Sequence, residues 1–213
     1  MRAFRTLNEA LQVACDHPET GLRLLDRKER PTWMPWAEVH QRAAAVAGRL
    51  QALGVQKGDR VVLVFPTCAG FFDAYFGALL AGAVPVPVYP PVRLGRMDEY
   101  HQRTARMITL VGAPLVLADP KVHRVIGETI ALAKPRLGAK TLAALPKAEL
   151  TPVDVQPDDL GLVQFSSGTT VDPKPVALSH RALLAQTEIL LDLVTAQDEH
   201  PDAGVSWLPL YHD

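Results

Sequence analysis

The chain has 213 residues, of which 48% are hydrophobic and 21% charged, a composition that is typical of a globular protein and excludes general disorder. The formal net charge is -1 at pH 7 and the sequence pI is near 6.7. Because phosphate-driven binding needs a basic surplus, we expect no nucleic acid partner, and any anion site must be local.

The amino-terminal sequence does not have the form of a secretion signal. Residues 1–17 lack an unbroken apolar stretch and predict a helix instead. The longer apolar runs, such as residues 71–88, are broken by Asp, Gly and Pro well short of a membrane span. We therefore expect a cytoplasmic protein without a membrane span.

The cysteines and histidines give no metal-binding pattern. Cys15 and Cys68 are far apart in the sequence, and we interpret both as buried, small hydrophobic side chains and not as a disulfide. The seven histidines show no HxxxH or HExxH spacing, and no CxxC is present, so a transition-metal site made by protein ligands alone is not predicted. A magnesium ion held through a nucleotide is compatible with this pattern.

The first half of the chain alternates between helix and strand patterns. Apolar residues recur every three or four positions over residues 36–53, which predicts a helix that Gly54 ends. The β-branched run at residues 61–65 predicts a strand buried on both faces. Residues 70–81 predict a second helix. We expect its aromatic side chains to pack against a sheet, and a lipid pocket is the alternative.

A proline-rich segment and an arginine-rich segment follow. Residues 84–91 read VPVPVYPP and predict an edge strand that runs into a loop, because proline cannot donate to a central ladder. The next helix is expected from Asp98 to about Val111. Four arginines in or just before it suggest a phosphate site, but a solvated helix face is the preferred interpretation, and we do not place them in the site. They are Arg93, Arg96, Arg103 and Arg106.

The order of elements predicts the fold class. Residues 115–117 predict a third strand, residues 120–133 a further helix, and residues 145–159, rich in Pro and Asp, a surface linker. Strands that alternate with helices predict an α/β fold with a largely parallel sheet flanked by helices on both faces. Such folds bind ligands beyond the carboxyl ends of the strands, so we expect a site in the loops there.

One loop carries the chemistry. It follows a strand predicted at residues 160–165, and residues 166–174 read SSGTTVDPK. Four hydroxyl groups, a glycine, a run of amide donors and one flexible cation suit the oxygens of a polyphosphate. Neither GxGxxG nor GxxxxGK[ST] is present, so neither the dinucleotide-binding loop nor the Walker loop explains the segment. A polar turn between two strands is the alternative.

The segment from Phe165 to Lys174 resembles the signature phosphate loop of the acyl-adenylate-forming (AMP-binding) enzymes. Residues 178–180, LSH, resemble the start of the family's following helix, and residues 207–213, WLPLYHD, resemble its next motif at the family's spacing. Residues 84–91 and 207–213 are most similar to the fatty acyl-AMP ligases, close relatives of fatty acyl-CoA synthetases. The resemblance extends over essentially the whole chain.

The resemblance implies ATP-dependent activation of a fatty acid to acyl-AMP with release of pyrophosphate, and then transfer to an acyl carrier protein. Transfer to coenzyme A, as in the acyl-CoA synthetases, and a non-catalytic nucleotide-binding or interaction module are the alternatives. ATP and Mg²⁺ are the implied cofactors. The implied residues are Lys174 and His212 for catalysis; Ser166, Ser167, Gly168, Thr169, Thr170 and Lys174 for the phosphates; and Thr170 for magnesium.

The sequence departs from the family in two ways. Val171 and Pro175 stand where most family loops have glycine, so the loop backbone is more restricted. The family's domain is also much longer. We therefore interpret residues 1–213 as a partial amino-terminal adenylation domain without the carboxyl-terminal domain, inactive alone, and a truncated enzyme in preference to a degraded gene product. Because a cut sheet exposes a strand edge and apolar surface, we expect a homodimer.

Overall fold

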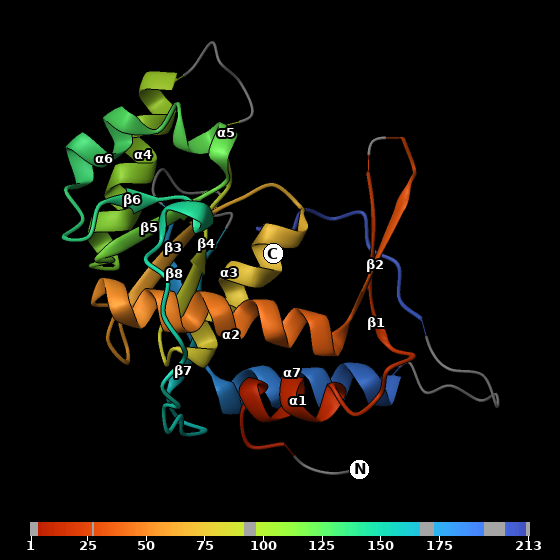
Figure 1. Ribbon diagram of the computed structural model, residues 1–213. Coiled ribbons are helices and arrows are strands. Elements are labelled where there is room, and N and C mark those ends of the chain that lie inside the picture. The colour runs from red at the N-terminus through yellow and green to blue at the C-terminus, as the bar shows by residue number, and fades with distance from the viewer. Residues whose placement is uncertain (1–3, 27, 92–96, 167–172, 194–202, 212–213) are drawn as a thin grey trace.

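The computed structural model describes residues 4–26, 28–91, 97–166, 173–193 and 203–211 (Figure 1). The helices are α1 (Leu7–Ala14), α2 (Trp36–Leu53), α3 (Ala69–Leu80), α4 (Met97–Leu110), α5 (Pro120–His123), α6 (Gly127–Ala133) and α7 (His180–Leu193), with a short 3-10 turn, η2 (Leu142–Ala144). The strands are β1 (Gly21–Leu25), β2 (Pro31–Pro35), β3 (Arg60–Val64), β4 (Val84–Pro87), β5 (Leu115–Ala118), β6 (Ala139–Lys140), β7 (Leu160–Phe165) and β8 (Pro175–Ser179).

A four-stranded sheet forms the centre of the molecule. Its strands lie in the order β4-β3-β5-β6, and every neighbouring pair is parallel. Helices α2 and α3 cover one face, and α4 and α6 lie on the other (Figure 1). The predicted α/β class with a parallel sheet and helices on both faces is therefore confirmed.

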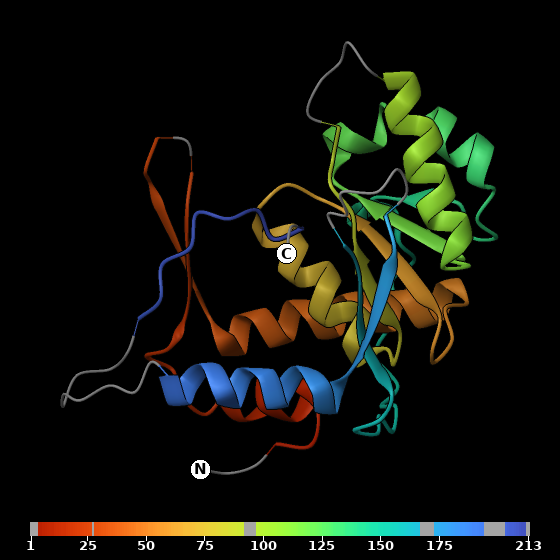
Figure 2. The same ribbon diagram turned by 180° about the vertical axis from the view of Figure 1, so that it is seen from behind.

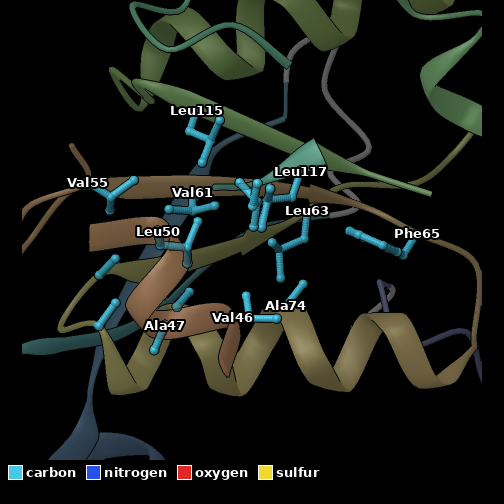
Figure 3. Packing of buried hydrophobic residues seen from close by; sticks show 14 of the residues in the cluster. Val46, Ala47, Leu50, Val55, Val61, Leu63, Phe65, Ala74, Leu115 and Leu117 are labelled. Atoms are coloured by element: carbon cyan, nitrogen blue, oxygen red, sulfur yellow. The ribbon is translucent and has the colours of Figure 1, made fainter. Parts of the chain in front are cut away.

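The central strands are buried on both faces because their side chains alternate between two hydrophobic clusters. Val61 and Leu63 of β3 point toward α2 and α3, where they meet side chains such as Leu50 (Figure 3). Val62 and Val64 point the other way, into the cluster that includes residues of α4 and α6. The aromatic residues of α3 belong to core packing, as predicted: Phe71 is buried in the first cluster, Phe72 and Tyr75 pack against it, and Phe76 packs against a third cluster.

Strand β4 is the edge strand that its prolines predicted. The amides of Val84 and Val88 face β3 and donate to its neighbouring carbonyls at 2.8 and 2.9 Å. Pro85 and Pro87 alternate with them, so the outer edge of β4 lacks N–H donors at these positions. Strand β7 lies beside this edge and packs through side chains in the same cluster, but among the described strands its ladder partner is β8 alone (Figure 2).

Besides the short strand β6, which was not predicted, three parts of the fold differ from the sequence prediction. The helix expected over residues 120–133 is two helices, because the chain turns after α5, where the Val125 amide donates to the Val122 carbonyl at 2.9 Å. This turn places Ile126 in the core at 1% exposure. The antiparallel hairpin β1–β2 was not predicted. The third difference is that strands β7 and β8 pair antiparallel, outside the parallel sheet.

The prediction that Cys15 and Cys68 are buried was wrong, because both are only half-buried. Cys15 is the C-cap of α1 and Cys68 the N-cap of α3, so both lie at the end of a helix. The Cys15 thiol donates to the Leu11 carbonyl at 3.2 Å. Partial burial still raises the pKa of both thiols.

A bidentate ion pair joins α2 to α3. The Arg42 guanidinium donates to both carboxylate oxygens of Asp73, from Nε at 2.9 Å and from Nη2 at 2.7 Å. Asp73 is only 7% exposed, whereas the Arg42 side chain is 41% exposed and also contacts Glu38 at 3.3 Å. Since both hydrogen bonds of Arg42 to Asp73 are charge-assisted, the pair fixes the register of the two helices.

Replacing this carboxylate should destabilise the fold measurably. We expect Asp73→Ala to lower the free energy of unfolding by about 1–3 kcal/mol, near the lower end because solvent screens the exposed Arg42. Glu38→Ala, which removes the exposed partner of the same arginine, should cost less than about 0.5 kcal/mol. Urea unfolding of both variants measures the difference, and equal losses would contradict the assignment.

The segment between η2 and β7 crosses the back of α2 without forming a helix or strand. The Arg49 guanidinium donates to the Leu145 carbonyl at 2.7 Å, and Gln51 exchanges two hydrogen bonds with the backbone of Thr151 at 2.8 and 3.0 Å. Leu145 is buried at 4% exposure. The segment 145–159, called the strap below, is therefore fixed to α2 over residues 145–151, and Lys57 holds its second half through Asp154 and Asp159.

Candidate functional site

The predicted phosphate loop is held at both ends by a β-hairpin. Strands β7 and β8 are antiparallel, with Phe165 opposite Pro175. One step further out, the Ser166 amide donates to the Lys174 carbonyl at 3.0 Å. The segment therefore connects two antiparallel strands, and both of its ends are fixed to the same hairpin.

The structure describes only part of the predicted site. Ser166 is half-buried at the end of β7, and Lys174 is exposed beside it at the start of β8. Within the described ranges, no ion pair joins Lys174 to an acidic side chain. The remaining predicted phosphate and metal ligands, Ser167, Gly168, Thr169 and Thr170, lie outside the described residues, so their roles stay predictions, as does that of Val171.

Pro175, the second departure from the family pattern, is accommodated by the strand. It is the first residue of β8, a position where the missing N–H is tolerated. Its φ restriction therefore falls on extended backbone. The substitution does not disrupt the ladder that closes the loop.

The second motif returns to the carboxyl end of the parallel sheet. Leu210 packs against the core cluster beneath α2 and α3, and its amide donates to Thr67 Oγ1 at 3.4 Å. Thr67 follows β3 by three residues, so the motif lies where an α/β fold places its ligands. Trp207, at 88% exposure, does not join the core. His212 lies outside the described residues, and its predicted catalytic role is not tested.

His180 has a role that the sequence motif did not reveal. It begins α7, and the residue is 1% exposed. The Leu7 amide is in the first turn of α1, where backbone donors have no partner within the helix. It donates to His180 Nδ1 at 3.1 Å. This hydrogen bond joins α1 and α7, which lie side by side in Figure 2. Burial lowers the pKa of His180, and the charge of Asp159 opposes this shift.

This buried imidazole should make stability depend on pH. Because the folded pKa is below that of the unfolded chain, the unfolded state binds the proton first, and stability falls as the pH drops below about 6.5. We expect the urea midpoint to be lower at pH 5.5 than at pH 7.5, with a smaller difference in His180→Gln. His17→Gln, at an exposed position, should keep the wild-type difference. An unchanged pH dependence in His180→Gln would refute the role.

Neither a metal centre nor a membrane helix is found in the described parts of the chain. No three His, Cys, Asp or Glu side chains described by the structure come close enough together to hold a metal ion. Among the same residues, no helix is both long and apolar enough to cross a membrane. A protein-built metal site thus has no support in these residues.

Comparison with solved structures places the fold among adenylating enzymes. A fatty acyl-adenylate ligase from a study of the E. coli and L. pneumophila enzymes superposes with a TM-score of 0.84, at 27% identity, over 98% of this chain and 38% of that one. The L. pneumophila fatty acyl-adenylate ligase, solved with acyl adenylate and pyrophosphate, superposes with a TM-score of 0.74, at 26% identity, over 88% of this chain and 32% of that one.

Sequence comparison finds relatives of the same kind. A candidate acyl-CoA synthetase of Caulobacter vibrioides is 33% identical over 99% of this chain and 36% of its own length. A long-chain-fatty-acid–AMP ligase of Mycolicibacterium smegmatis is 29% identical over 88% of this chain and 30% of its own length. The chain thus spans about a third of the relatives that it matches. The family model of the AMP-binding enzymes matches residues 10–213. The chain belongs to the AMP-binding enzyme family.

Proposed function

We propose that the protein containing this chain activates a fatty acid with ATP, forming acyl-AMP and releasing pyrophosphate. The observation that carries the proposal is the SSGTTVDPK segment, held at its ends by the Ser166 to Lys174 hydrogen bond on the β7–β8 hairpin. Relatives named as fatty acid–AMP ligases and fatty acyl-adenylate ligases support the substrate class.

Electrostatics explains why such a loop suits the reaction. A carboxylate and a polyphosphate are both anions, so adenylation needs donors and cations that stabilise charge as it develops at phosphorus and on the departing pyrophosphate. The Lys174 ammonium, exposed at the base of the loop, would supply the point charge. The hydroxyls and amides of residues 166–170 would hold the β- and γ-phosphates, with Thr170 also as a magnesium contact, and His212 would lie near the reacting carboxylate.

The described residues fit the nucleotide but supply no separate metal site. Ser166 and Lys174 offer a hydroxyl and an ammonium on one side of the hairpin, which suit phosphate oxygens. No cluster of acidic or histidine ligands accompanies them in the residues that the structure describes. Magnesium would therefore be held mainly through the ATP phosphates, where it would neutralise charge.

The acyl acceptor is proposed to be an acyl carrier protein, as the fatty acid–AMP ligase relatives favour. Coenzyme A is the second candidate, favoured by the Caulobacter vibrioides relative.

We further propose that residues 1–213 form part of an amino-terminal adenylation domain that is located in the cytoplasm and is inactive alone. Exposed apolar residues on α7, such as Leu190 and Leu193, would promote a homodimer. A monomeric sizing profile at high concentration would rule out the dimer.

Pyrophosphate exchange tests the proposed activity. ATP, magnesium, labelled pyrophosphate and a panel of fatty acids would be incubated with this chain and with a version extended along its gene to the length of the relatives. We expect exchange in the extended protein and none in the chain alone. Absence of exchange in both with every acid would favour the binding-module alternative. Adding holo carrier protein or coenzyme A then identifies the acceptor.

A further inference from the structure

A cleft of about 680 Å³ lies along α4 and borders the phosphate loop at one point. Its walls come from α4, from Leu132 of α6 and from Pro173, at the foot of the phosphate loop. Its size is within the range of small-molecule sites. The α4 residues that line it include Arg103, Arg106, Met107 and Leu110, which share one helix face by their spacing.

One part of the cleft is apolar and open to water. Leu110 of α4 is 62% exposed and Leu132 of α6 is 51% exposed. The two helices are neighbours, but their contact does not cover these side chains. Met107, buried at 4% exposure, lies one turn from Leu110 and contributes to the floor. Adjacent exposed leucines in a concave surface are typical of a binding site for an apolar group.

The other part of the cleft is cationic. The Arg103 guanidinium carbon lies 5.8 Å from the centre of the Tyr89 ring, which holds the side chain in place. Its Nε is buried and has no hydrogen-bond partner among the described residues. Arg106 follows one turn later, exposed at the cleft wall. A buried donor without an acceptor is costly, so an anionic ligand reaching Arg103 would be stabilised.

We propose that this cleft binds the monomeric anion of a fatty acid. The carboxylate accepts hydrogen bonds from Arg103 and Arg106, since guanidinium groups match carboxylate geometry. The acyl chain covers Met107, Leu110 and Leu132. Pyrophosphate or a free nucleotide could bind the arginines but would leave the apolar part of the cleft in contact with water. An amphiphilic ligand covers both parts and is therefore favoured. The proposal rests on α4 and stands whether or not the protein adenylates its ligand.

Photolabelling locates the bound acid. The full chain would be irradiated with a dodecanoate analogue carrying a diazirine near its methyl end, at a concentration below that of micelle formation. Mass spectrometry should find the label on the peptides containing Leu110 and Leu132, and an excess of dodecanoate should suppress it, whereas dodecanol and pyrophosphate should not. Label found only elsewhere, or equal competition by pyrophosphate, would overturn the proposal without touching adenylation.

Variants test the cationic part. Arg106→Gln should weaken dodecanoate binding by about tenfold, because one charge-assisted hydrogen bond is lost. Leu132→Ser should weaken it through the apolar part, and Arg124→Gln, at an exposed position outside the lining, should leave it unchanged. Unaltered binding in Arg106→Gln and Leu132→Ser would overturn the site. The protein could instead sediment with anionic vesicles in a manner that depends on these arginines, and fail to bind monomeric dodecanoate. This result would overturn the assignment of a fatty acid as the ligand and favour a membrane surface.

Discussion

Lys174→Ala should abolish most of the adenylation activity of the extended protein. We expect pyrophosphate exchange to fall by about 100-fold to 1,000-fold, the usual cost of removing one group that stabilises charge in the transition state. Lys174 is exposed and closes the loop through its backbone carbonyl, not through its side chain. The loss should therefore appear in the rate, with little change in the unfolding midpoint.

Two further variants make this result specific. Lys174→Arg keeps a cation at the base of the loop and should retain more activity than alanine, although it lacks the compact ammonium. Lys147→Ala removes an equally exposed lysine from the strap and should behave like the wild type. If Lys174→Ala kept more than half of the exchange rate, its assignment to the phosphate site would be wrong.

Gly48→Ala should cause a large loss of stability for a single added methyl group. Gly48 is on α2 beneath the strap, and a Cβ atom there would lie 2.4 Å from the Glu149 carbonyl carbon and 2.5 Å from the Leu150 amide nitrogen. Backbone atoms cannot turn aside as a side chain can. We expect a loss of about 1–3 kcal/mol in the free energy of unfolding, reduced by the better helix propensity of alanine.

Proteolysis would show whether the added methyl group displaces the strap from α2. Lys147 is already exposed, but once the strap is displaced its backbone should be free to enter a protease site, so trypsin should cut Gly48→Ala after Lys147 faster than the wild type. Gly127→Ala is the matched control, because it also adds a methyl group to a helical glycine but meets no atom within 4 Å. It should unfold like the wild type. Equal stability of the two variants would mean that the strap is not packed on Gly48.

The sequence predicted the elements whose physics is local. The stripe on α2 and its end at Gly54, which has φ +97°, could be identified because periodicity and glycine conformations depend on neighbouring residues. The buried strand β3 was predicted for the same reason. The β1–β2 hairpin was missed because its strands are half exposed and contain Pro31 and Pro35, so no clear alternation identifies them.

Pairing and environment could not be predicted in the same way. That β7 pairs antiparallel with β8, and not with β4, depends on which edges meet in three dimensions. The use of His180 Nδ1 as an acceptor for an amide 173 positions away has no local signature either. Of the site, the sequence predicted the polar loop through its composition and its likeness to a family. The geometry that closes the loop, from Ser166 to Lys174, came from the structure.

The proline edge of β4 has a mechanical consequence. Because Pro85 and Pro87 offer no amide toward β7, the hairpin that carries the phosphate loop contacts the four-stranded sheet through side chains alone at this boundary. If β7 and β8 slide or tilt at this boundary, side chains such as Val163 must repack, but the backbone hydrogen bonds of both sheets are kept. The second motif is hydrogen-bonded at Thr67, on the other side of that boundary. The hairpin with the phosphate loop and the second motif can therefore move relative to each other without loss of the backbone hydrogen bonds within either one.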